Sequence, residues 1–213
     1  ITIEGDYVHY WHMIDFLEHT MVFGEQDYDS LQQLLDIKNY TDYFIAEMYY
    51  CNVDWPNNNI KYWREKEEGS RWRYIMYDLD PGMGHFGPQS YNMLNKVLNT
   101  NIPYTHNHII LRRMLQYGEY EKDFINRFAD MLNTIFRPEN VQSSIDSVLM
   151  QIEGEMPRHM EKWDGSMTIW QNNVDEIREF GNERPAIQRQ HIIDEFNLDH
   201  EVTITVKTMP EGT

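Results

Sequence analysis

Residues 52–84 restrict the fold more than any other part of this sequence. Pro56 and the three consecutive asparagines at 57–59 disfavour a helix or a central strand, so the start of this segment is predicted to be a loop. Two short runs rich in Ile, Tyr and Trp follow at 60–64 and 71–77, joined by a polar turn. The segment therefore predicts a β-hairpin within a chain whose remaining apolar residues mostly recur at helical spacing.

Acidic and amide side chains lie on both sides of this predicted hairpin. Asp54 and Asn59 are five positions apart in the loop before it, and Asp78 and Asp80 enter a glycine-containing turn after its second strand. Phosphoryl transfer to a hydroxyl needs a carboxylate that orients and accepts the proton. It also needs an amide oxygen and a second carboxylate that hold the divalent ions on the phosphates. Protein kinases present these groups in this order, with a hairpin before the third.

The order predicts a role for each residue. Asp54 is the candidate catalytic carboxylate, and Asn59 and Asp78 are the candidate ligands of a metal-bound nucleotide. Asp80 either adds a metal ligand or caps the glycine turn. Because the hairpin folds the chain back, Asp54 and Asp78 are expected to face one site although they are far apart in sequence.

The same residues resemble those of the spore coat protein H (CotH) kinase family. The matching positions are Asn52, Asp54, Trp55, Pro56, Asn58, Asn59, Tyr62 and Trp63, then 72–75, 77–80 and 111–115, followed by Arg158, His159, Trp163, Glu183, Arg184, Pro185 and His191. The resemblance implies the C-terminal lobe of an atypical protein-kinase-like fold. It further implies ATP, a divalent cation such as Mg²⁺, Mn²⁺ or Ca²⁺, a protein hydroxyl as acceptor, and an extracellular or cell-surface location. Pro81 and Met83 depart from the family's usual Asp-x-Asp-x-Gly-Phe-Gly turn.

Three other classes of protein share part of this residue pattern. A bacterial surface or coat interaction module could keep this fold without transferring phosphate, which leaves the enzymatic assignment open. A calcium-binding EF-hand is excluded, because its twelfth position would be Gln89 rather than a glutamate. A metal-dependent glycosyltransferase would use an Asp-x-Asp pair such as Asp78 and Asp80, but no doubly wound βαβ pattern precedes it.

Length and composition favour one domain, predicted over residues 1–200 as mostly α with a small β-hairpin. Residues 201–208 alternate as a strand, which would begin a β-rich module over 201–213. Neither a Gly-rich loop nor a strand lysine precedes Asn52, so the nucleotide-covering lobe is expected upstream of Ile1. On that expectation the chain alone binds ATP weakly and has little activity.

The net charge of −17 argues against nucleic acid or an anionic membrane surface as the general partner, because both are polyanions. The hairpin is more basic than the rest, which fits either solvated strand faces or a nearby phosphate; its cations are Lys61, Arg64, Lys66, Arg71 and Arg73. No run of 18 apolar residues is present, so no membrane span is expected. Cys51 is the single cysteine, and its apolar neighbours predict a buried core residue.

Helical periodicity predicts the scaffold around the hairpin. A helix is expected over 6–23, followed by a loop over 24–30; the apolar face of the helix is predicted to carry Val8, Trp11, Ile14, Leu17 and Met21. A second helix is expected from Tyr40, with Asn39 as its N-cap. Further helices are expected at 93–98, within a substrate-facing or connecting loop, and after 107, 120, 138, 169 and 185.

Polar and aromatic residues outside the hairpin segment are interpreted as structural. Arg158, His159, Arg184, Arg189 and His191 are predicted to make polar contacts between helices, with substrate binding as the less favoured role. The tryptophans around the hairpin are predicted to pack in the core rather than to stack on bases.

Overall fold

The computed structural model describes residues 5–99, 107–200 and 202. Within these residues the chain forms nine helices and one two-stranded antiparallel sheet. The helices are α1 (Val8–His19), α2 (Glu25–Leu34), α3 (Ile37–Tyr50), α4 (Met93–Asn99), α5 (Asn107–Met114), α6 (Gly118–Asn133), α7 (Pro138–Ile152), α8 (Met156–Lys162) and α9 (Met167–Glu195); the strands are β1 (Lys61–Trp63) and β2 (Arg73–Ile75). The predicted fold class, mostly α with a small hairpin, is confirmed.

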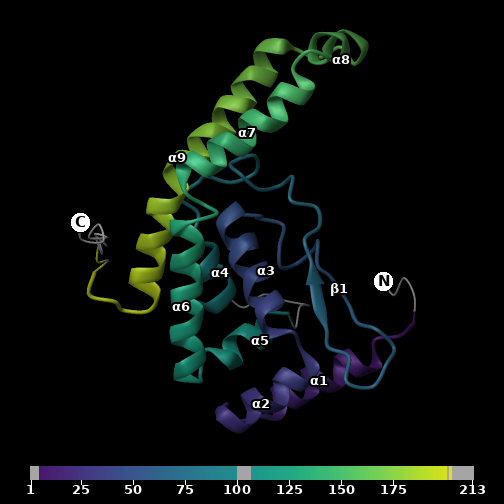
Figure 1. Ribbon diagram of the computed structural model, residues 1–213, viewed down its shortest axis with the longest axis vertical. Coiled ribbons are helices and arrows are strands. Elements are labelled where there is room, and N and C mark those ends of the chain that lie inside the picture. The colour runs from purple at the N-terminus through teal and green to yellow at the C-terminus, as the bar shows by residue number, and fades with distance from the viewer. Residues whose placement is uncertain (1–4, 100–106, 201, 203–213) are drawn as a thin grey trace, which may run out of the picture.

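Helix α3 is the central element of the main body. It contacts β2, α4, α6 and α9, while α1 packs against α5. Figure 1 shows the hairpin on one side of α3 and α6 with the lower half of α9 on the other. The upper half of α9 pairs with α7, and together with α8 these helices form an arm that projects away from the body.

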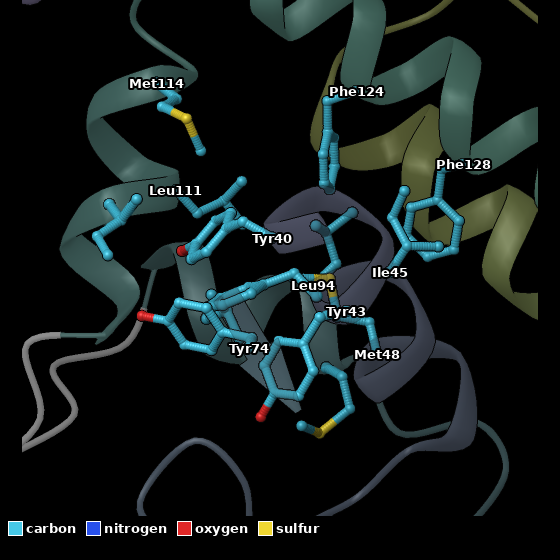
Figure 2. Close-up of a cluster of buried hydrophobic side chains, with 14 of the residues drawn as sticks. Tyr40, Tyr43, Ile45, Met48, Tyr74, Leu94, Leu111, Met114, Phe124 and Phe128 are labelled. Atoms are coloured by element: carbon cyan, nitrogen blue, oxygen red, sulfur yellow. The ribbon is translucent and has the colours of Figure 1, made fainter. Parts of the chain in front are cut away.

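The hydrophobic core surrounds α3 on nearly all sides. Tyr40, Phe44 and Met48 lie four residues apart on one face, and Tyr49 on the opposite side is also fully buried. Figure 2 shows side chains of α3 against those of the hairpin, α4, α5 and α6, including Tyr74. Each such side chain contributes about 1.5–3 kcal/mol by leaving water. Buried side chains cover most of the circumference of α3, so this burial fixes the position of the chain that leaves its C-terminal end.

The hairpin has one buried and one exposed face. Tyr62 pairs with Tyr74 in the register, and this pair faces the core, whereas the flanking pairs face outward. The outer edge of β2 is covered by the side-chain amide of Asn39, which donates to the Tyr74 carbonyl (3.2 Å) and accepts from the Tyr74 amide (2.6 Å). Asn39 therefore substitutes for a neighbouring strand. The prediction that it caps α3 is wrong, because Asp36 is the N-cap and accepts from the Asn39 backbone at 3.2 Å.

Helix α1 is shorter than predicted, and only Ile14 and Leu17 of its predicted apolar face are buried. Its buried residues are Tyr10, Met13, Ile14 and Leu17, whereas Val8, Trp11 and Met21 are exposed. Both sets recur at helical spacing, and contact with α5 decides which set is buried.

Helix α2 replaces a loop predicted over 24–30. Its first turn carries Glu25 and Asp27, and the Asp27 carboxylate accepts from the Gly24 backbone at 3.0 Å. With Leu31 as its single fully buried residue, the helix has too sparse an apolar face to be recognised from periodicity.

Helix α9 is continuous where two helices were predicted. Pro185 lies inside it, although an interior proline costs about 3 kcal/mol. Buried side chains on both sides of Pro185, among them Phe180 and Ile192, pack against the body and offset this cost. The predicted strand at 201–208 lies outside the described residues, Val202 apart. None of the helices that the structure describes could cross a bilayer, since each is too short or too polar.

Candidate functional site

The candidate site begins where α3 ends. Cys51, buried as predicted, has a φ of 56° in the left-handed region and turns the chain away from the helix axis. The next residues form the site loop, which we define as residues 52–59. Trp55 in this loop is fully buried and packs edge-on against Phe44, with ring centroids 4.8 Å apart. Trp72 is also buried, but Trp63 is 42% exposed. The predicted core packing is therefore confirmed for Trp55 and Trp72 and is wrong for Trp63.

The loop brings Asp54 next to two asparagines and the Asp78 backbone. Asn58 Nδ2 donates to Asp54 Oδ1 and Asn59 Nδ2 donates to Asp54 Oδ2, both at 3.2 Å. Asn59 Nδ2 also donates to the Asp78 carbonyl at 3.5 Å. Residues from both sides of the hairpin therefore meet, as the sequence predicted. Both hydrogen bonds of the Asn59 side chain use its nitrogen, so its oxygen is not engaged by them.

Asp78 and Asp80 form a pair of exposed carboxylates beside this loop. A hydrogen bond with Asp80 raises the pKa of Asp78, and desolvation and the negative charges of Asp80 and Asp54 raise it further. Lys61 partly opposes these effects on the pKa. Its ammonium lies 3.2 Å from the centre of the Tyr77 ring. The three carboxylates repel one another, which is the electrostatic condition under which a cation binds.

The turn after Asp80 is fitted to the end of α3. Met83 donates its backbone N–H to the Tyr50 carbonyl at 2.7 Å, and a Cβ on Gly82 would lie 2.6 Å from that same oxygen. Only glycine allows this approach. Met83 has a φ of 54°, which is unfavourable for a residue with a side chain. Despite its departure at this position from the usual family sequence, the turn is tied to the same helix that leads into the site loop.

Buried polar residues that the sequence analysis did not select hold the loop and the turn. Glu47 on α3 is fully buried, and its Oε2 accepts from Asn52 Nδ2 at 3.0 Å. The same Asn52 nitrogen donates to the Asp78 carbonyl at 3.2 Å. A glutamate within the apolar face of a predicted helix was the available signal for Glu47. Asn52 was recognised only as part of the matching motif.

Lys96 on α4 also holds the site loop. Its ammonium donates to the carbonyls of Val53 (2.7 Å) and Trp55 (2.9 Å), the two residues that flank Asp54. Burial lowers the pKa of Lys96, and the nearby Asp54 carboxylate opposes this. A lysine inside a short predicted helix carried no signal of this role, because the contact joins segments about 40 residues apart in sequence.

Residues predicted to connect helices do so only in part. Arg184 is fully buried and binds carbonyls at the end of α3, and Arg189 binds Asn133 on α6 at 2.8 Å. Arg158 is exposed and pairs with Glu155 next to its own helix (3.1 Å), so the prediction for Arg158 is wrong. His159 is exposed and lies near Trp163 one turn on.

Two hairpin cations make structural contacts, although Arg73 also stays exposed to solvent. Arg73 pairs with Asp36 at 2.9 Å, and Arg64 donates to the Ser70 carbonyl at 3.1 Å and lies over the Trp72 ring. The structure therefore assigns these two arginines to holding the hairpin.

The site offers oxygen ligands of the kind that Mg²⁺, Mn²⁺ and Ca²⁺ prefer, namely the carboxylates of Asp78 and Asp80 and the Asn59 amide oxygen. Across residues 5–99, 107–200 and 202, no three His, Cys, Asp or Glu side chains are grouped so as to hold a metal by themselves. Two carboxylates and one amide oxygen would fill only part of the coordination sphere of such a cation, and the remaining ligands would have to be other oxygens.

Fold and site together define an α+β protein with carboxylates and an amide at the base of a hairpin. A family model described as CotH kinase protein matches residues 2–187. This match spans most of the 213 residues, so the chain belongs to the CotH kinase family. The resemblance noted in the sequence is thereby confirmed. No curated protein and no solved structure matched the chain.

Proposed function

We propose that this chain carries the catalytic loop and the metal-binding turn of a phosphotransferase. The proposed reaction moves the γ-phosphoryl group of ATP to a hydroxyl on a protein, within a C-terminal lobe of the protein-kinase-like type. The observation that carries the proposal is the meeting of Asp54, Asn59 and the Asp78 backbone at the base of the hairpin, in a member of the CotH kinase family. This order of groups is the one that phosphoryl transfer requires.

Asp54 has the role of orienting the acceptor hydroxyl and accepting its proton. Its two carboxylate oxygens are held by Asn58 and Asn59, one each, and each oxygen keeps a further lone pair for the substrate. The loop is fixed by the buried side chain of Trp55 and by the hydrogen bond from Lys96 to the Val53 carbonyl. Such support lowers the reorganisation needed when the hydroxyl approaches.

Asn59, Asp78 and Asp80 would hold the divalent cation, Mg²⁺, Mn²⁺ or Ca²⁺, together with the phosphates of ATP. When bound, the cation neutralises the negative charge of the phosphates. The raised pKa of Asp78 supports this assignment, because mutual repulsion among carboxylates is relieved by a positive ion. A Gly-rich loop and a strand lysine are absent from residues 1–51, so these parts of a kinase site would come from another segment.

The family also suggests where the protein acts. The resemblance to this family implies a secreted or surface-attached bacterial protein. We therefore propose an extracellular or cell-surface location, with protein acceptors at that location. The net charge of −17 supports proteins rather than nucleic acids as partners.

A transfer assay tests the proposal on the longest natural protein that contains these residues. Radiolabelled ATP with Mg²⁺ or Mn²⁺ is the donor, and Asp54→Asn and Asp78→Asn are the variants. We expect Asp54→Asn to lower phosphate transfer by about 100-fold or more, since removal of a general base costs about 10²–10⁴. Asp78→Asn should also lower it, because it removes a proposed ligand of the cation on the phosphates. The matched control is Asp123→Asn, at an exposed aspartate of α6, which should transfer at the wild-type rate.

A surface or coat interaction module is the second candidate function. Large apolar side chains are exposed on the arm of α7, α8 and α9, as a protein-binding surface would require; they include Val148, Met150, Ile152, Trp163 and Ile169. Equal phosphate signals from the wild type, Asp54→Asn and Asp78→Asn would favour this module over the enzyme.

A further inference from the structure

Asn52 connects the end of α3 to the turn that carries Asp78. Its side chain is fully buried, and its Nδ2 donates both to Glu47 Oε2 at 3.0 Å and to the Asp78 carbonyl at 3.2 Å. Its backbone N–H also donates to the Glu47 carbonyl at 3.3 Å. The two protons of one amide nitrogen thus join a helix residue to the first residue of the turn.

The Asp78 carbonyl is the point at which the two sides of the site meet. It accepts from Asn52 and from Asn59, and Asn59 in turn donates to the Asp54 carboxylate. Asp78 has a φ of 57°, a left-handed conformation that is costly for a residue with a Cβ. Such a conformation persists where surrounding contacts fix it. The direction of the Asp78 carboxylate therefore depends on the hydrogen bonds to its own carbonyl.

Glu47 is a poor choice for the core if stability alone is considered. It is fully buried on α3, and among the described residues its Oε1 has no partner with good hydrogen-bond geometry, although the nearby Tyr43 hydroxyl acts to lower its pKa. Burying a carboxyl group with incomplete hydrogen bonding is unfavourable, because the group loses more hydrogen bonds to water than it regains in the core. An apolar side chain would pack there at lower cost. The contact that Glu47 does make orients Asn52 toward the Asp78 turn.

We propose that Glu47 and Asn52 are positioning residues that hold the Asp78 turn at a fixed place relative to Asp54. The inference deepens the proposed function, because Asp78 and Asp54 are its metal ligand and its base. The contacts run from Glu47 through the Asn52 amide to the Asp78 carbonyl, and from there through Asn59 to Asp54.

The test compares Glu47→Leu with Glu47→Gln. Leucine fills the same space but removes the acceptor, so one N–H of the buried Asn52 amide loses its partner while the apolar packing around α3 is kept. Glutamine keeps an oxygen for Asn52 and places an amide near the Tyr43 hydroxyl. We expect hydrogen exchange at residues 78–84 to rise about 10-fold in Glu47→Leu and to stay near wild type in Glu47→Gln.

Phosphate transfer by the same variants gives the second readout. Outer contacts of a metal site typically change activity by 10–100-fold, so Glu47→Leu and Asn52→Ala should lose about that much. Glu47→Gln should stay within about 3-fold of wild type, since it keeps the acceptor oxygen. Asn57→Ala is the matched control, because Asn57 is an exposed asparagine of the same loop. Thermal melts confirm that each variant is folded.

The outcomes separate this inference from the proposed function. Wild-type exchange at 78–84 in both Glu47→Leu and Asn52→Ala overturns the inference, as does a Glu47→Gln variant that behaves like Glu47→Leu. If Asp54→Asn and Asp78→Asn transfer as much phosphate as wild type, the proposed function fails. The exchange measurement then still decides whether Glu47 and Asn52 position the turn.

Discussion

The Asp78 carbonyl is an unusual acceptor, because two asparagine side chains from one loop donate to it. Asparagine suits this role since its amide carries two protons and can join two acceptors. Aspartate at position 52 or 59 would have no proton to donate and would place a negative charge beside the Asp78 carbonyl oxygen. The residue types in the loop are therefore explained by donor chemistry as well as by turn preference, and nothing in the sequence indicated this donor role.

The titration of Glu47 is expected to make stability depend on pH. Burial raises its pKa from 4.5 to about 7, and the hydrogen bond from Asn52 partly opposes this. The folded state therefore binds more protons than the unfolded state between about pH 4.5 and 7. The stability contributed by the protonated carboxyl is fully present below this window and is lost as pH rises through 7.

The Glu47→Gln variant removes this titration. Its free energy of unfolding relative to wild type should rise between pH 4.5 and 8, by up to about 3 kcal/mol for a pKa difference of that size. Urea denaturation at several pH values measures the difference. Glu67→Gln, at an exposed residue of the hairpin turn, reports the background. A relative stability of Glu47→Gln that stays constant across this range would contradict the prediction.

At the scale of elements, the glycine turn and α3 fit each other closely. The Tyr50 carbonyl at the end of α3 accepts from Met83, and Gly82 lies beside the same oxygen. Helix ends leave carbonyls without partners, and here the turn supplies one. The sequence predicted a glycine-containing turn here. It did not predict the close approach of the Tyr50 carbonyl, which requires glycine at position 82.

Gly82→Ala is expected to move the turn away from α3. Its Cβ would lie 2.6 Å from the Tyr50 oxygen and 3.1 Å from the Leu79 oxygen, and both are backbone atoms that cannot rotate aside. The free energy of unfolding should fall by about 1–3 kcal/mol, the usual cost of overpacking. Gly118→Ala is the control, because a Cβ there meets nothing within 4 Å at the start of α6. Urea denaturation compares the two, and equal stabilities would refute the steric argument.

At the scale of the whole molecule, Arg184 joins three segments that are distant in sequence. From the interior of α9 it donates to the carbonyls of Met48 (2.7 Å) and Tyr49 (3.0 Å), and to those of Gln89 and Tyr91. A cation is favourable at the carbonyl end of a helix such as α3. The same side chain thus anchors the long helix, the central helix and the segment that follows the turn.

Arg184→Met is expected to destabilise the whole molecule. The substitution leaves buried carbonyls without donors, so the free energy of unfolding should fall by about 2–4 kcal/mol. Arg184→Lys should recover only part of this, because an ammonium lacks the planar set of donors. Arg158→Met is the control, since that side chain is 84% exposed and should change stability by less than about 0.5 kcal/mol. A thermal midpoint of Arg184→Met equal to wild type would refute the role of Arg184.

Much of the fold and of the candidate site could be predicted because the signals are local. The hairpin, the helices α3, α4, α6 and α7, and the order of Asp54, Asn59 and Asp78 follow from turn residues, apolar spacing and motif order within short windows. The extent of α1, the presence of α2 and the continuity of α9 through Pro185 could not be predicted. For α1 and α9, packing against distant segments outweighed local preference, whereas α2 has too sparse an apolar face to be recognised.

The sequence by itself determined which groups could do chemistry and the order in which the chain presents them, since these depend on residue type and spacing. Only the tertiary structure decided what holds them in place. Glu47, Lys96 and Arg184 act through hydrogen bonds to loops and carbonyls that the fold brings near. Such contacts depend on where distant segments meet, and the packing of apolar side chains around α3 fixes that meeting in three dimensions.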